Sequence, residues 1–315
     1  MINVSIIGNS NIARKHLIPA FNNHPSFNIV NIASRSKRES NEDVIKYFEN
    51  YEQAVNQKDV DLIYVSLPNS MHYEICEYAL KKNKHVIVEK SLTTSNQESK
   101  RLIDLAKKNE LILFENFQFQ FHDQFQFIKN IVMSSELGSL KFIDSSFMFP
   151  PFQDEDNIRY KKDLGGGSLL DAGAYPIMIT NLLVPDEDLE VISAKSTEKK
   201  NAVDISGAFS LISKDSLIVS HCKHSFNSHY ACSLCLTFTN GQILADRIFT
   251  APPGFKAKVL VSNSSGTKTY YFECNHFIKM LDYIVTSLNN VHKFDFMPMI
   301  RQSKLLHKIN KICQN

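Results

Sequence analysis

The first third of the chain alternates short apolar runs with amphipathic stretches, and this alternation constrains the fold more than any other feature. The apolar runs are rich in β-branched residues and lie at 3–7, 27–33, 60–66, 84–88 and 111–114. Between them, residues 70–82 and 95–108 place their apolar side chains at helical spacing. Strands and helices that take turns predict right-handed crossovers and a mostly parallel sheet, the doubly wound class.

The pattern changes beyond about residue 117. We expect a helix at 122–136, a strand at 139–149, a helix within 167–184 and then several strands. Turn signals separate those strands, at 213–216, 226–228, 240–241 and 263–266. Helical segments near 275–289 and 296–312 close the chain. We therefore predict an α/β protein with a doubly wound Rossmann domain over residues 1–117. An α+β domain with a large, mainly antiparallel sheet follows over 118–315, and its C-terminal helices are free to pack back on the first domain.

Charge and composition limit the possible partners. The 315 residues carry 35 Lys+Arg and 33 Asp+Glu, a net charge of +2 that gives no reason to expect nucleic acid or a membrane surface as a partner. No apolar run approaches the roughly 18 to 20 residues of a membrane span, and no secretory signal opens the chain, so we expect a cytoplasmic protein with small-molecule ligands. The six cysteines are dispersed, which favours free thiols. Cys232 and Cys235 fall in an expected strand and would point to opposite faces, so no metal site is predicted.

A candidate phosphate-binding loop follows the first expected strand. The segment Gly8-Asn9-Ser10-Asn11-Ile12-Ala13 lies between a strand and a helix, as a G-x-G-x-x-G/A fingerprint does in dinucleotide-binding proteins. Gly8 permits the tight turn, Ala13 permits close packing, and the helix start offers N–H groups to a pyrophosphate. Ser10 replaces the second glycine, so either the loop lies farther from the phosphate or the hydroxyl itself donates to it. Taken alone, the loop is equally compatible with an ordinary capped turn.

The end of the second strand indicates which dinucleotide would bind. An NAD enzyme places Asp or Glu there, whereas this chain has Ser34-Arg35-Ser36-Lys37-Arg38. Arginine pairs with a 2′-phosphate through two hydrogen bonds and stacks on adenine. We therefore predict NADP(H), with a solvated basic turn as the alternative.

Three further segments follow expected strands or open a helix: residues 66–72 (SLPNSMH), 88–91 (VEKS) and 165–176 (GGGSLLDAGAYP). With them, the chain resembles the glucose–fructose oxidoreductase and inositol dehydrogenase (Gfo/Idh/MocA) family. That family carries a Rossmann domain, an x-Pro-Asn-x-x-His segment, a Glu-Lys-Pro motif and a Gly-Gly-Gly-x-x-x-Asp-x-Gly-x-His/Tyr motif. All four have counterparts here in the same order. The resemblance is greatest to the sugar-nucleotide ketoreductase and dihydrodiol dehydrogenase-like branch.

The resemblance implies site residues at matching positions. Lys90 matches the family's active-site lysine, and an ammonium there stabilises an oxyanion. Tyr175 matches the His/Tyr position and is assigned the proton, because its phenolate is favoured beside a lysine. Asp171, one helical turn earlier, would hold a substrate hydroxyl or orient the tyrosine. Ser91 stands where the family usually has proline, which puts the placement of Lys90 in question.

Other residues are assigned to cofactor and substrate binding. Glu89 would support the lysine or the nicotinamide, and the cofactor channel would be lined by Leu67, Pro68, Asn69 and His72. His72 is equally compatible with a role as a helix cap. Arg159 and Tyr160 lie in a segment that resembles reductases of nucleotide-activated sugars, and Arg159 would suit a diphosphate. A plain surface arginine is the alternative. Asn116 is expected to face sugar hydroxyls, although the aromatic residues around it also fit domain-interface packing.

We therefore expect an NADP(H)-dependent oxidoreductase that transfers hydride to or from a sugar carbon, with reduction of a keto group on a nucleotide-linked sugar preferred. Two alternatives stay open. The first is an NADP-dependent dehydrogenase of a free aldose, polyol or dihydrodiol. The second is a non-catalytic sensor that binds dinucleotide. The resemblance also implies a homo-oligomer, a dimer or tetramer, formed through one face of the second domain's sheet.

Overall fold

The computed structural model describes residues 1–35 and 45–314. By their contacts these residues form two compact units. The first unit contains residues 1–116 and 277–300, and the second contains residues 117–276 and the C-terminal residues from Arg301. Each unit has its own sheet and its own hydrophobic core.

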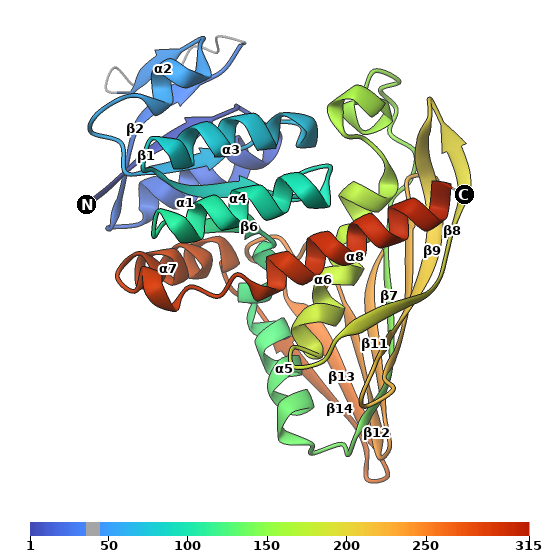
Figure 1. The fold of residues 1–315 in the computed structure, drawn as a ribbon. Helices are drawn as coiled ribbons and strands as arrows, with labels where there is room; N and C mark the ends of the chain where they lie inside the picture. Colours follow the sequence, from blue (N-terminus) through green and yellow to red (C-terminus); the bar gives the residue numbers. More distant parts are fainter. Residues whose placement is uncertain (36–44, 315) are drawn as a thin grey trace. The chain divides into compact units, whose positions relative to one another are not determined.

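The first unit is built on a parallel sheet of six strands (Figure 1). The strands are β1 (Ile2–Ile7), β2 (Phe27–Ala33), β3 (Lys46–Phe48), β4 (Leu62–Val65), β5 (His85–Glu89) and β6 (Leu113–Asn116). Their order is β3-β2-β1-β4-β5-β6, and every neighbouring pair is parallel. This is the strand order of a doubly wound dinucleotide-binding sheet, in which ligands bind beyond the carboxyl ends of the strands.

Helices connect these strands. They are η1 (Ala13–Leu17), α1 (Ile18–Asn23), α2 (Tyr51–Val55), η2 (Asn69–Met71), α3 (His72–Lys81) and α4 (Asn96–Lys108). The apolar faces of α3 and α4 join β4, β5 and β6 in one buried cluster. From Phe277, α7 (His276–Leu288) also belongs to this unit, where Phe277 stacks on His16 with ring centroids 4.8 Å apart. The short η7 (Val291–Lys293) follows.

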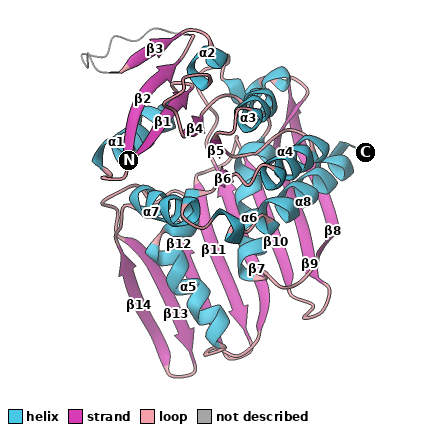
Figure 2. Ribbon diagram, turned by 60° about the vertical axis from the view of Figure 1, so that its left-hand side comes forward, coloured by secondary structure: helices cyan, strands magenta, loops and turns pink. Residues whose placement is uncertain are grey.

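The second unit is built on an eight-stranded sheet (Figure 2). Its strands are β7 (Leu140–Met148), β8 (Leu189–Lys200), β9 (Val203–Ser213), β10 (Val219–Ser225), β11 (Ala231–Phe238), β12 (Gly241–Asp246), β13 (Ala257–Asn263) and β14 (Gly266–Phe272). Their order is β14-β13-β12-β11-β7-β10-β9-β8. All neighbours are antiparallel except β7 and β10.

Helices cover one face of this sheet. They are η3 (Gln118–Phe121), α5 (Asp123–Ser134), η4 (Ile158–Tyr160), η5 (Lys162–Leu164), η6 (Leu169–Gly173) and α6 (Ala174–Leu183), with α8 (Met297–Gln314) contributing from Arg301. Figure 2 shows α5 and α6 against the strands, where α5 packs on β13 and β14, and α6 packs on β7 and β10. Every residue of α6 is buried, which agrees with its apolar sequence.

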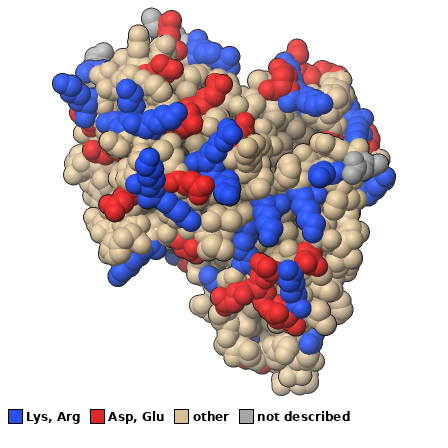
Figure 3. Space-filling model, in the orientation of Figure 1, with Lys and Arg blue, Asp and Glu red and all other residues tan. Residues whose placement is uncertain are grey.

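The predicted fold class is confirmed. The first-domain strands occur where the apolar runs predicted them, and β3, only three residues long, is an addition to the expected set. Alternation along β11 buries Cys232 and leaves Cys235 half exposed, as expected for a strand. Within the described residues, no helix is long and apolar enough to cross a membrane. Acidic and basic side chains are interspersed over the face shown in Figure 3.

Candidate active site

The turn after β1 requires glycine at its first position. Gly8 has φ +95°, a conformation that residues with a side chain rarely adopt. A Cβ atom there would overlap the carbonyl of Ser66 and lie 2.9 Å from Leu67 Cδ2. Main-chain bonds also connect the loops, since Gly8 N–H donates to Ala33 O at 2.9 Å and Ser66 N–H donates to Ile7 O at 2.7 Å. The carboxyl ends of β1, β2 and β4 are thereby held close together.

A helix begins directly after this turn, at Asn11. The first N–H groups of a helix have no partner within the helix, which makes this end suitable for a phosphate. The Ser10 hydroxyl accepts from the Ala13 N–H at 3.2 Å and also shares a hydrogen bond with the Ser66 hydroxyl. Ser10 therefore caps the helix and braces the loop against β4. Ile12, the remaining predicted loop residue, lies in the first turn of this helix.

The basic segment after β2 is described only at its start. Ser34 N–H donates to Phe48 O at 3.0 Å, and the Arg35 side chain is exposed. Arg35 thus stands at the carboxyl end of β2, where a 2′-phosphate would be recognised. The predicted partners Lys37 and Arg38 lie outside the described residues.

The segment after β4 is braced by a buried histidine. Leu67, Pro68 and Asn69 are partly exposed, whereas His72 is fully buried at the start of α3. Its Nδ1 lies 2.9 Å from Ser91 O, and its Nε2 lies 2.8 Å from Leu67 O. Burial lowers the pKa of His72, and the two carbonyl groups oppose this shift. The ring therefore ties the segment after β4 to the segment after β5. His72 is the first residue of α3, but its side chain makes no capping hydrogen bond, so the capping alternative is not supported.

Lys90 lies immediately after β5, at the carboxyl end of the strand that lies between β4 and β6 in the parallel sheet. The peptide bond between Lys90 and Ser91 is cis, at the position where the family usually has proline. The Lys90 ammonium acts electrostatically on three neighbours, Glu89, Glu115 and His72. A lysine placed at a strand end near half-buried Glu89 and buried Glu115 is suited to meet a developing negative charge on a ligand.

Glu89 belongs to a hydrogen-bonded network on one face of the sheet. Its Oε1 accepts from the Tyr64 hydroxyl at 2.7 Å and from Asn116 Nδ2 at 2.8 Å. Burial raises the pKa of Glu89, while these two donors and Lys90 lower it. Asn116 is fully buried, and its Oδ1 has no hydrogen-bond partner among the described residues. One N–H of the Asn116 amide is therefore used by Glu89, and its predicted contact with a sugar would use the second N–H or the oxygen.

Glu115 was not assigned by sequence analysis. It lies at the same end of the strands as Glu89 but on the opposite face of the sheet. It pairs with Val88 on β5, whereas Glu89 pairs with Asn116, so strand alternation separates the two carboxyl groups. Glu115 is 4% exposed, and its Oε1 accepts from the Leu92 N–H at 2.8 Å. An acidic residue inside the apolar run LILFEN was the signal in the sequence that indicated this role.

In the second unit, Arg159 and Asp171 form an ion pair. Arg159 Nε donates to Asp171 Oδ2 at 2.5 Å, and the Asp171 side chain is 19% exposed. Asp171 raises the pKa of Arg159, and Tyr175 contributes in the same direction. The guanidinium also lies over the Phe152 ring, 4.9 Å from its centroid. Three predicted site residues of the second unit, Arg159, Asp171 and Tyr175, therefore lie near one another. The Nε donor of Arg159 is already used by Asp171.

Tyr175 lies in an aromatic cluster. Its ring is 5% exposed and packs against Phe117, Phe147 and Phe249, with centroids 5.3, 4.9 and 5.4 Å away. Packing on several sides restricts the orientation of the ring. These contacts come from segments that are far apart in the sequence.

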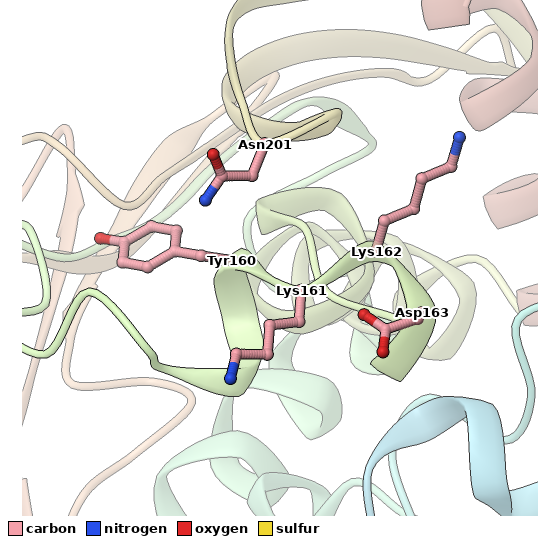
Figure 4. Close-up of a pocket in the computed structure, with 5 residues that line it drawn as sticks. All are labelled: Tyr160, Lys161, Lys162, Asp163 and Asn201. Carbon is pink, nitrogen blue, oxygen red and sulfur yellow. The ribbon is translucent and has the colours of Figure 1, made fainter.

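Tyr160 is 4% exposed, and its hydroxyl accepts from the Phe152 N–H at 3.1 Å. The same residue lines an open hollow of about 670 Å³ with Lys161, Lys162, Asp163 and Asn201. Figure 4 shows Asn201 beside this loop, with Lys161 and Lys162 pointing away from each other. Tyr160 thus packs mainly within the protein, and its contact with substrate stays a prediction.

A second buried network, also missed from the sequence, holds the start of the segment that carries Asp171 and Tyr175. The Ser168 hydroxyl donates to Asp204 Oδ2 at 2.6 Å and accepts from His224 Nδ1 at 2.8 Å. Asp204 Oδ2 also accepts from the Leu169 N–H at 2.6 Å. Burial lowers the pKa of His224 to about 4. The network is polar and satisfied, so it anchors η6 and α6 to β9 and β10.

Comparison with known proteins agrees with this geometry. Residues 2–117 match the model of an oxidoreductase family with an NAD-binding Rossmann fold, GFO_IDH_MocA, and residues 125–244 match the GFO/IDH/MocA C-terminal domain. A dTDP-3,4-didehydro-2,6-dideoxy-α-D-glucose 3-reductase of Saccharopolyspora spinosa is 34% identical over 82% of this chain and 79% of its own length. A D-xylose 1-dehydrogenase (NADP(+)) of Haloferax volcanii is 25% identical over 85% of this chain and 83% of its own.

A solved structure shows the same fold. The 3-ketoreductase from Actinomadura kijaniata, in complex with NADP and TDP-benzene, superimposes with a TM-score of 0.92 and is 27% identical. The match covers 99% of this chain and 98% of that chain. The predicted family and its ketoreductase branch are therefore confirmed, and the chain belongs to the GFO/IDH/MocA oxidoreductase family.

Proposed function

We propose that this chain is an NADP(H)-dependent oxidoreductase that reduces a keto group of a nucleotide-linked sugar. The observation that carries the proposal is the position of Lys90, at the carboxyl end of β5, where its charge acts on half-buried Glu89 and buried Glu115. A cation held there stabilises the oxyanion that forms as a ketone accepts hydride. Relatives named as 3-ketoreductases of dTDP-linked sugars support the substrate class.

The residues present fit a dinucleotide. Gly8 lets the first loop approach β4 closely, the helix from Asn11 offers its first N–H groups, and the described residues at the end of β2, Ser34 and Arg35, include no carboxylate. Arg35 would pair with the 2′-phosphate, and Leu67, Pro68 and Asn69 would line the channel. When bound, NADPH supplies the hydride. A solved relative that holds NADP supports the same choice.

Two side chains would manage the proton and the charge on the reacting oxygen. The Lys90 ammonium would stabilise the negative charge, and the Tyr175 hydroxyl would give its proton to that oxygen. The aromatic cluster around Tyr175 holds its ring in one orientation and excludes water from it. Asp171, through Arg159, would set the position of the substrate beside Tyr175.

Arg159 would bind the diphosphate while keeping its ion pair. A guanidinium has five N–H donors, and the bond to Asp171 uses the one on Nε. The donors on Nη1 and Nη2 are the ones that would face a phosphate. The Asp171 carboxylate fixes the direction of this fork, which favours a planar, two-pronged contact with phosphate oxygens.

The test is substrate turnover. Purified protein is mixed with NADPH and a TDP-linked 3-keto sugar, and loss of NADPH absorbance is followed with free keto sugars as the comparison. We expect turnover of the nucleotide-linked sugar, lowered by about 10²- to 10⁴-fold in Lys90→Met and in Tyr175→Phe. Turnover of free sugars alone would contradict the proposed substrate class. A function unchanged in both variants would favour a non-catalytic sensor.

We also propose a homo-oligomer that forms through the open face of the eight-stranded sheet. Phe142 on β7 and Leu244 on β12 point to this face and are 46% and 40% exposed. Large apolar side chains on a continuous sheet surface favour burial against a second copy. Light scattering of the native protein would show a dimer or tetramer, and Phe142→Asp with Leu244→Asp would shift it to monomer. A monomeric native protein would refute this.

The six free thiols are consistent with a reducing cytoplasm, which we propose as the location of the protein.

A further inference from the structure

The turn that carries Lys90 is held from two sides by buried titratable side chains. On one side, His72 Nδ1 lies 2.9 Å from Ser91 O. On the other, Glu115 Oε1 accepts the Leu92 N–H at 2.8 Å. The main-chain groups of the two residues after Lys90 are therefore each bonded to a side chain from another segment of the first unit. The family motifs account for the lysine, and no motif accounts for Glu115.

The position and the burial of Glu115 allow its carboxyl group to hold this turn. It lies on β6 with 4% of its surface exposed, so water does not compete for its carboxyl group. Its bond to Leu92 N–H reaches across from β6 to the segment after β5. The Lys90 ammonium also interacts electrostatically with it. A buried carboxyl group in this position affects both where Lys90 lies and how much charge surrounds it.

We propose that Glu115 is a positioning residue for the reaction, whose carboxylate anchors the turn from Lys90 to Leu92 and balances the charge of the Lys90 ammonium. The inference deepens the proposed function, because it gives Lys90 its role in stabilising the substrate oxygen. A charged acceptor holds an amide N–H more strongly than a neutral one. The ionised form of Glu115 is therefore the one that keeps Lys90 in place.

The surrounding charges set where Glu115 ionises. Burial raises the pKa of Glu115 to about 7, while the Leu92 N–H and the Lys90 ammonium lower it. The other titratable groups around this turn include Lys90 and also His72, whose pKa burial lowers. On the opposite face they include Glu89 and Tyr64, whose pKa values burial raises. A pKa of about 7 means that Glu115 changes its charge near neutral pH. The turn is held firmly above that pH and more loosely below it.

The first arm of the test needs no substrate. The carboxyl carbons of glutamate are labelled with ¹³C, and Glu115→Gln identifies the resonance that belongs to Glu115. We expect this resonance to titrate near pH 7. Lys90→Met should raise the midpoint by about 0.5 unit or more, because a stabilising cation is lost, whereas Lys90→Arg should leave it in place. A midpoint near the ordinary value of glutamate, or one that Lys90→Met leaves unchanged, would overturn the inference.

The second arm measures the pH dependence of the reaction. Glu115→Gln keeps an oxygen that accepts from Leu92 N–H but cannot ionise, so it imitates the protonated form. We expect kcat above pH 7 to fall by about 5- to 20-fold, with the step near pH 7 lost and the Kd for NADPH changed less than about twofold. The matched control is Glu74→Gln, an exposed glutamate on α3, which should retain both the rate and the step.

The two arms separate the possible failures. A Glu115→Gln protein that keeps the step near pH 7 would refute the positioning role. An NADPH affinity that falls together with kcat would show a general loss of structure and would also refute it. If the unmodified protein reduces no nucleotide-linked sugar, the proposed function fails, while the ¹³C titration still decides whether Glu115 and Lys90 are coupled.

Discussion

Glu115 should make the stability of this protein depend on pH in a direction that is unusual for a carboxyl group. Its pKa in the folded protein is about 7, whereas the ordinary value is 4.5. The folded state therefore binds a proton more tightly than the unfolded state between these values. Stability from this group is greatest below the unfolded pKa and is lost as the pH rises through the folded one.

The magnitude follows from the two pKa values. A shift of about 2.5 units corresponds to about 3 kcal/mol at full ionisation, at about 1.4 kcal/mol for each unit. Most of this change falls between pH 5 and pH 8, so about 2 to 3 kcal/mol should be lost over that range. The carboxyl group is almost fully buried, so solvent screening reduces this value little.

The measurement compares urea unfolding of the native protein and Glu115→Gln at several pH values. The variant does not titrate at this position, so the difference between the two free energies of unfolding isolates Glu115. We expect the native protein to lose about 2 to 3 kcal/mol relative to the variant from pH 5 to pH 8. For the exposed control Glu74→Gln, the difference should stay constant within about 0.5 kcal/mol. A Glu115→Gln difference that does not change with pH would refute the reasoning.

The remaining predictions concern the cofactor loop and the start of the second unit's helix. Arg35→Ala should weaken NADPH binding by about 10- to 100-fold while leaving NADH unchanged, because a charge-assisted pair worth about 1.5 to 3 kcal/mol is lost. Titration by protein fluorescence measures both, and an equal loss for the two cofactors would contradict the assignment. Gly8→Ala combines a strained backbone, about 1 to 3 kcal/mol, with overlap of the carbonyl that follows β4. Its melting temperature should fall more than that of Gly254→Ala, which has a similar φ of +81° but no neighbour within 4 Å. Equal decreases in melting temperature for the two variants would show that the overlap with the Ser66 carbonyl costs no stability. Asp204→Ala removes the acceptor for a hydroxyl and a main-chain N–H and should cost about 1 to 3 kcal/mol in urea unfolding. The exposed Asp215→Ala should cost little, and a similar small cost for Asp204→Ala would show that its network does not support the helix.

The polar network at Ser168, His224 and Asp204 illustrates how the second unit supports its site. The network ties the segment that begins at Ser168 to two neighbouring strands. Asp171 and Tyr175 lie in the turns that follow. A site residue on a helix can be positioned only as precisely as that helix is anchored.

Sequence periodicity was sufficient for the longer strands and helices of the first unit, but not for the short β3 and α2. Side-chain alternation and helical spacing are local properties, so runs such as 27–33 and 95–108 indicate their own structure without reference to the rest of the chain. The loop at Gly8 was also recognisable, because it lies directly after a clear strand, whereas Lys90 was assigned a role from the resemblance to the family. The strand β3 was not recognisable, because three residues are too few to show a period.

Contacts between distant residues were decided by the tertiary structure. Glu115 meets Leu92, His72 meets Ser91, and Arg159 pairs with Asp171, and none of these partners can be inferred from spacing along the chain. That residues 277–300 belong to the first unit was likewise decided by the tertiary structure and could not be inferred from spacing along the chain. Local sequence determines which surface of each element is apolar. Which polar groups are buried together, and how their charges then shift, depends on how the elements pack.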